Sequence, residues 1–145
     1  MNYWWLALAA GAVLPLQAVI NGRLATGLGG PLPAANVSFA VAALALVVLQ
    51  LVVRQSLPQG AQIASIPLWA WVGGLLGVVY VAGAIVSVGA MGAAAAVCLM
   101  IAGQIGAALL IDKFAILGAV DHPVTLLRLF GAILVAAGTA IVVLN

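Results

Sequence analysis

The chain has 145 residues, of which 68% are hydrophobic and only 4% are charged, with a formal net charge of +2. About a quarter of the residues of a soluble domain are charged, so this composition excludes a water-facing surface, and most of the surface must face lipid or another apolar chain. The few basic residues are scattered singly, which excludes the clustered cations of a nucleic-acid-binding surface.

Five stretches are apolar enough to cross the hydrocarbon core of a bilayer, which takes about 20 residues. The backbone must satisfy its own hydrogen bonds in lipid, so each stretch is predicted to be a helix. The spans are residues 4–20, with room for a helical continuation to Leu28, and residues 34–53, 68–89, 93–111 and 125–144. The prediction is an all-α membrane protein in which residues 1–145 form a single five-helix transmembrane domain.

The first span begins at Trp4 with no Lys or Arg before it, which favours a membrane span over a signal peptide. Pro15 lies inside this span and is predicted to kink it. The other prolines are expected between spans, where proline costs least. They are Pro31, Pro33, Pro58, Pro67 and Pro123.

The connections differ in character. Residues 54–67 are the most polar, and residues 90–92 are so short that the third and fourth spans should form a tight hairpin. The last connection, residues 112–124, contains the apolar run 114–117, which we expect along the membrane interface. On the third span Gly73 and Gly77 form a small-xxx-small pair, which predicts close helix packing.

An odd number of spans places the two termini on opposite sides of the membrane. Arg54, Lys113 and Arg128 fall on the side of the N-terminus, and Arg23 falls on the other side. The excess of basic residues favours a cytoplasmic N-terminus.

Residues for catalysis are scarce. The chain has no glutamate, one histidine and one cysteine, and no nucleophile–base pair or metal-ligand cluster is visible in the sequence. We therefore expect no enzyme, no cofactor and no metal. Asp112 ends the fourth span and Arg128 opens the fifth on the same side, which predicts a structural ion pair at the interface.

Uncharged polar residues remain within or near the spans. Gln17 and Asn21 are four residues apart and share one helix face. The others are Asn36, Ser38, Tyr80, Ser87 and Gln104. Two interpretations stay open, because a polar group in hydrocarbon requires a partner. These groups either join helices by hydrogen bonds or line a solute pathway, for which Gln17, Asn21, Tyr80, Ser87 and Gln104 are the candidate contacts. Arg23 is either an interfacial cation or a gate or anion contact.

Several segments in order resemble the YdcZ-like five-helix family of inner-membrane exporters, a branch of the drug/metabolite transporter superfamily. The resemblance covers nearly the whole chain and rests on residues 11–24 (GAVLPLQAVINGRL), 33–39 (PAANVSF), 71–81 (WVGGLLGVVYV), 103–114 (GQIGAALLIDKF) and 128–138 (RLFGAILVAAG). The family pattern often has a glycine after the aspartate-x-phenylalanine, where this chain has Ala115.

The resemblance implies a bacterial inner-membrane, multi-pass half-transporter that moves a small-molecule substrate by alternating access. It implies an antiparallel dimer of inverted topology, formed with itself or with a related five-helix chain. The glutamate that couples small multidrug exporters to protons is absent here. The alternative hypothesis is a non-transporting membrane subunit that assembles with a larger complex.

Overall fold

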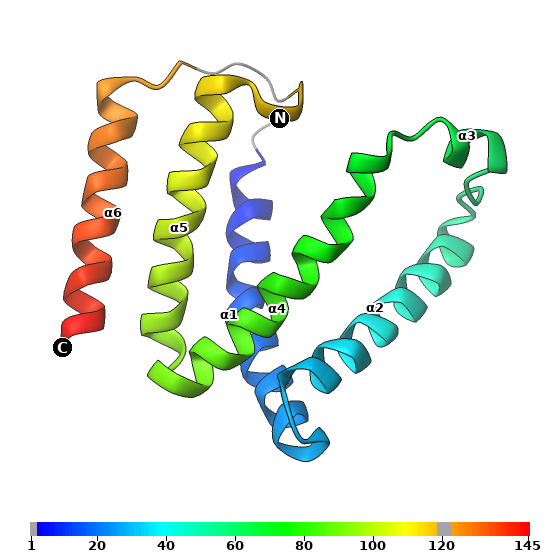
Figure 1. The fold of residues 1–145 in the computed structure, drawn as a ribbon, viewed down its shortest axis with the longest axis horizontal. Helices are drawn as coiled ribbons and strands as arrows, with labels where there is room; N and C mark the ends of the chain where they lie inside the picture. The colour runs from blue at the N-terminus through cyan, green and yellow to red at the C-terminus, as the bar shows by residue number, and fades with distance from the viewer. Residues whose placement is uncertain (1–2, 119–122) are drawn as a thin grey trace. The chain divides into compact units, whose positions relative to one another are not determined.

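The structure, a computed structural model, describes residues 3–118 and 123–145, so that Asp121 and His122 lie outside the described residues. Within those ranges the chain is helical (Figure 1). The elements in order are α1 (Trp4–Leu28), α2 (Pro31–Val53), α3 (Gly60–Ala64), the 3-10 helix η1 (Leu68–Trp71), α4 (Val72–Met91), α5 (Ala93–Phe114), the 3-10 helix η2 (Ile116–Gly118) and α6 (Leu126–Leu144).

The predicted all-α fold with five spans is confirmed. Among the described residues, five helical segments are long and apolar enough to cross a membrane: α1, α2, η1 with α4 (Leu68–Met91), α5 and α6. The predicted continuation of the first span to Leu28 is also confirmed. The chain divides into two compact units, residues 1–86 and residues 87–145, and the boundary falls inside α4.

In the first unit, α1 and α2 are joined by Gly29 and Gly30 alone. Gly29 adopts a left-handed conformation (φ 80°, ψ 15°) and caps α1, and the Gly30 N–H donates to the carbonyl oxygen of Ala25 at 2.9 Å. Pro31 is the first residue of α2. Placing Pro31 and Pro33 between the spans was therefore wrong, because the first N–H groups of a helix have no partner within the helix and proline is tolerated there.

The connection after α2 contains a short helix that the sequence analysis missed. α3 begins after Gln59, whose N–H donates to Oε1 of Gln62 at 2.9 Å in a capping box. The 3-10 helix η1 follows Pro67 and leads directly into α4. Since the polar residues of this connection cap a helix of five residues, their polarity marks a structured turn rather than an open loop.

The core of the first unit is small. Ala34 and Ala35 of α2 and Val81 and Ile85 of α4 are buried against one another, with Leu24, Ala25 and Tyr80 packed against them. The small alanine side chains of α2 thus lie against the larger Val81 and Ile85 side chains of α4.

A second contact between α2 and α4 involves the side chain of Phe39. A Cβ added at Gly77 would lie 3.4 Å from the Phe39 ring, whereas one added at Gly73 would have no atom of the described residues within 4 Å. Of the predicted small-xxx-small pair, Gly77 is therefore the member that faces a neighbouring side chain in the first unit.

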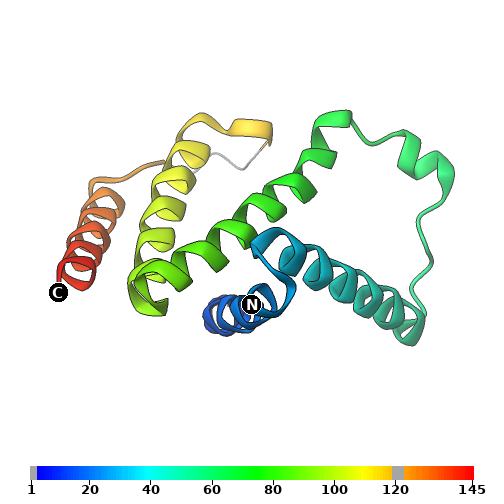
Figure 2. The same cartoon turned by 60° about the horizontal axis from the view of Figure 1, so that its bottom comes forward.

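In the second unit, α5 and α6 lie side by side (Figure 1, Figure 2). Only Gly92, with φ 82°, separates α4 from α5, so this connection is shorter than the predicted residues 90–92. Glycine adopts a positive φ without steric cost, which explains why residue 92 is a glycine. At the start of α6, the Thr125 hydroxyl accepts a hydrogen bond from the Arg128 N–H at 3.2 Å and caps the helix.

α5 ends later than predicted, at Phe114 instead of residue 111. Its cap is Ala115, which has a left-handed conformation (φ 45°, ψ 42°) and whose N–H donates to the carbonyl oxygen of Ile111. Glycine adopts this conformation without steric cost, whereas alanine does not. The position at which this chain departs from the family pattern is thus one where the backbone favours glycine.

Candidate functional site

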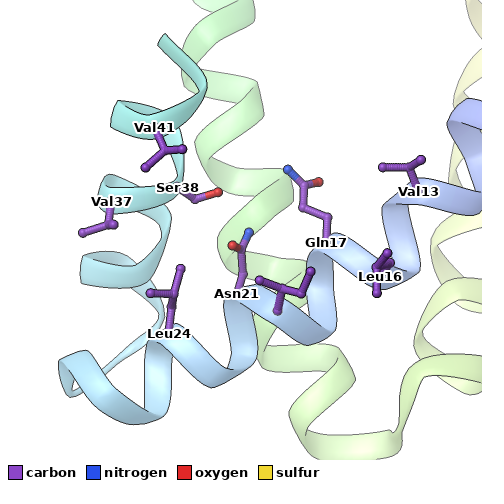
Figure 3. A pocket seen from close by; sticks show the side chains of 9 residues that line it. Val13, Leu16, Gln17, Asn21, Leu24, Val37, Ser38 and Val41 are labelled. Carbon is purple, nitrogen blue, oxygen red and sulfur yellow. The ribbon is translucent and has the colours of Figure 1, made fainter. Parts of the chain in front are cut away.

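Polar side chains of α1 and α2 meet in the first unit. Gln17 and Asn21 lie one turn apart on α1, and Ser38 lies opposite them on α2. Figure 3 shows the two amides and the hydroxyl directed into the space between the helices. The predicted shared face of Gln17 and Asn21 is present, and α2 adds a third polar group to it.

These three groups line a pocket of about 300 Å³. This volume is at the lower end of the range of small-molecule pockets, roughly 300–1,000 Å³. The rest of the wall is aliphatic and consists of Val13, Leu16, Ile20, Leu24, Val37 and Val41. The pocket therefore has an apolar body with a few convergent polar groups and a lining without charge.

Asn21 is the most unusual residue of this pocket. It is 3% exposed, and its Nδ2 has no hydrogen-bond partner among the residues that the structure describes. Leaving a buried donor unsatisfied costs roughly 1–3 kcal/mol. A buried hydroxyl elsewhere is satisfied, since Thr139 Oγ1 donates to the carbonyl oxygen of Cys98. Asn21 thus retains an unused, buried donor on a side chain that lines the pocket.

The other predicted contacts are distributed over the chain. Tyr80 is half-buried against the Ala34–Ala35–Val81–Ile85 cluster and does not line the α1–α2 pocket. Ser87 is a half-buried residue of α4 and Gln104 is an exposed residue of α5, and both belong to the second unit.

Arg23, the candidate gate or anion contact, is exposed and does not line the α1–α2 pocket. The structure therefore brings Gln17 and Asn21 together and leaves Arg23 outside this group.

Ser38 is a pocket residue that the sequence analysis recognised as polar but did not assign to the site. The available signal was its position in the second span, on the helix that follows α1 after a short connection. Periodicity relates residues within one helix, but it does not say which residue of the next helix lies opposite them.

A second pocket, of about 430 Å³, lies between α5 and α6. At its polar end Arg128 Nη1 lies 3.5 Å from Asp112 Oδ2, so the predicted ion pair is present. The side chains are 46% and 33% exposed, respectively, which makes this a solvent- or interface-accessible contact of the kind that contributes little to stability.

Comparison with known protein families gives one result that covers almost the whole chain. The model of the family described as "Putative inner membrane exporter, YdcZ" matches residues 2–141. Neither the comparison with curated proteins nor the comparison with solved structures gave a match. Together with the five apolar helices, this places the chain in the inner membrane as a multi-pass protein of a transporter family rather than of an enzyme family. The chain belongs to the YdcZ family of inner membrane exporters.

Proposed function

We propose that the chain is one half of a transporter that moves a small solute across the inner membrane by alternating access. Membership of an exporter family supports transport. The observation that carries the proposal is the α1–α2 pocket, in which a buried amide with an unused donor lies inside a membrane span. Polar groups in such positions mark solute pathways in membrane proteins.

The working unit is an antiparallel dimer in which each copy contributes a single five-helix domain. Many transporters consist of inverted halves around a site near the bilayer midplane, and a five-helix chain supplies one such half. The partner is a second copy of this chain or a related five-helix chain. The three-to-one distribution of basic residues favours one orientation per chain, which supports the related chain.

In this proposal the solute contacts are Gln17, Asn21, Tyr80, Ser87 and Gln104, with Arg23 as a gate or anion contact. Gln17 and Asn21 have the strongest support, because both line the pocket. Each group would appear twice in a two-fold dimer, which gives an amide- and hydroxyl-rich pathway.

The test begins with a thermal-shift screen of the detergent-solubilised protein against metabolite and drug libraries, because a ligand that binds the folded state raises its apparent stability. Any hit is then measured for flux in proteoliposomes. Gln17→Leu should impair flux and leave folding intact. Asn36→Leu is the matched control, since Asn36 is an exposed α2 amide that does not line the pocket.

The orientation of the copies is tested with single cysteines. Cys98 is the only cysteine of the sequence. A variant with Cys98→Ala and Asn145→Cys therefore carries a single thiol, at residue 145, and its labelling shows on which side of the membrane that residue lies. An antiparallel homodimer predicts labelling of about half the copies from each side by a membrane-impermeant thiol reagent. Labelling from one side only would require a related partner chain.

The alternative, a non-transporting subunit of a larger complex, predicts a different set of results. The reconstituted protein would give no flux of any ligand from the screen. It would instead co-purify with other membrane proteins after mild solubilisation.

A further inference from the structure

The α1–α2 pocket places specific demands on what it binds. Asn21 Nδ2 is a buried donor without an acceptor among the described residues, and the Asn21 side chain is directed into the pocket between the helices. A group that enters the pocket and carries a hydrogen-bond acceptor would remove the penalty of the unpaired donor. Binding energy would therefore come from an acceptor atom placed at Asn21.

The uncharged lining of the pocket further limits the class of ligand that it can bind. The residues that line the pocket are uncharged, and Arg23 does not line it. A cation or an anion would lose its hydration on entering without meeting an opposite charge, which is strongly unfavourable. An uncharged ligand avoids this loss.

The aliphatic side chains of the pocket wall determine the polarity of the rest of the ligand surface. Six aliphatic side chains surround three polar groups, so most of the ligand surface must be apolar. Gln17 and Ser38 each carry both a donor and an acceptor, and they can serve a hydroxyl or an amide beside the main acceptor. The volume of about 300 Å³ suits a small solute rather than a segment of protein.

We propose that the pocket binds an uncharged, mainly apolar solute with a carbonyl-type oxygen, which accepts a hydrogen bond from Asn21 Nδ2 beside Gln17 and Ser38. This inference deepens the proposed function and rests on it for the passage of the solute across the membrane. It assigns Ser38 to the site, and it excludes organic cations and anions as ligands of this pocket.

Benzophenone is a suitable probe, because it is an uncharged diaryl ketone that inserts covalently into nearby C–H bonds on irradiation. The full chain is reconstituted in bilayers, irradiated with increasing benzophenone, digested and mapped by mass spectrometry. Labelling of residues 13–41 should saturate. Excess acetanilide, which carries an amide carbonyl, should compete with it, whereas benzyltrimethylammonium and benzoate should not.

Variants separate the site from general partitioning into the bilayer. Asn21→Leu has nearly the same size and lacks the donor, so the saturable labelling should fall about fivefold or more. Ser38→Ala should cause a smaller decrease. Asn36→Leu should label like the wild type. Since Asn21 Nδ2 has no hydrogen-bond partner among the described residues, Asn21→Leu should fold, and its melting temperature should equal or exceed that of the wild type.

Several results would overturn the inference. Labelling that does not saturate, or that spreads evenly over all helices, would mean that no pocket is occupied. Equal labelling of Asn21→Leu and Asn36→Leu would show that Asn21 does not contact the ligand. Competition by benzyltrimethylammonium would show that the pocket is not selective for uncharged ligands. Failure of Asn21→Leu to fold would show that the amide holds the fold.

The same experiment keeps the two proposals apart, because photolabelling needs no transport. Saturable, Asn21-dependent labelling without flux would retain the binding site and reject the transporter. Flux of an identified solute with labelling that is indifferent to Asn21 would retain the transporter and reject this site.

Discussion

Thr139 of α6 donates a hydrogen bond of 3.1 Å from its Oγ1 to the main-chain carbonyl oxygen of Cys98 on α5. Thr139 is 6% exposed, so the bond lies within the packed surface between the two helices. Two helices that are both almost wholly apolar gain no hydrophobic energy from associating in lipid. A hydrogen bond between them therefore helps to fix how they pack.

Replacing Thr139 by valine should lower the free energy of unfolding by about 1 kcal/mol, because valine keeps the shape and removes the inter-helix bond. The measurement is reversible unfolding of the detergent-solubilised protein. Thr26→Val is the control, since Thr26 Oγ1 bonds within its own helix to Gly22 at 2.8 Å. If both variants unfold alike, the Thr139 bond contributes nothing specific to α5–α6 packing.

The ion pair of Asp112 and Arg128 predicts an unusual result for a charge swap. Asp112 lies in the last turn of α5 and Arg128 in the first turn of α6, and each charge is at the helix end where the macrodipole disfavours it. Asp112→Asn or Arg128→Gln should each lower stability by less than about 1 kcal/mol. The double variant Asp112→Arg, Arg128→Asp should be more stable than the wild type by up to about 1 kcal/mol.

The swap is informative because it keeps both charges on the same side of the membrane. Stability is compared at low and high salt, and added salt should reduce the differences. A swapped variant no more stable than either single replacement would mean that neither the pair nor the dipoles matter here.

Ala115 holds a left-handed backbone conformation at the end of α5, with φ 45°. Ala115→Gly should raise the free energy of unfolding by about 0.5–1 kcal/mol, because glycine relieves this strain by more than it adds chain entropy. Ala107→Gly, at an exposed position within α5, should instead lower stability by a similar amount. Destabilisation by both glycines would contradict the left-handed cap.

Gly77 and Gly73 should respond differently to larger side chains, although both belong to α4. Gly77→Ala should be tolerated, since the added Cβ would make an ordinary contact of 3.4 Å with the Phe39 ring. Gly77→Leu requires Phe39 to move and should cost about 1–3 kcal/mol. Gly73→Leu should be tolerated better than Gly77→Leu, because a Cβ added at Gly73 would have no atom of the described residues within 4 Å.

Thermal unfolding of the detergent-solubilised protein measures these effects. Combining Phe39→Ala with Gly77→Leu should restore part of the loss, because the smaller residue leaves room for the leucine. If Gly73→Leu proved as harmful as Gly77→Leu, contact with Phe39 could not be the cause.

Much of the fold was predictable because it depends on contiguous composition. The thickness of the hydrocarbon core and the need to satisfy the backbone act on each segment separately, so the five spans follow from runs of apolar residues. The shared face of Gln17 and Asn21 follows from helix periodicity alone. Errors occurred at the ends of helices, where prolines that can begin a helix were interpreted as breaks.

Only the tertiary structure decided which faces meet. In a soluble helix the apolar stripe shows what is buried, but a span that is apolar all round has no such stripe, because lipid is as apolar as the protein interior. The placement of Ser38 opposite Asn21, the contact of Gly77 with Phe39 and the bond from Thr139 to Cys98 depend on shape and on single polar partners across helices. Composition and periodicity carry no information about such pairings, so the unused donor of Asn21 became visible only once the helices were packed.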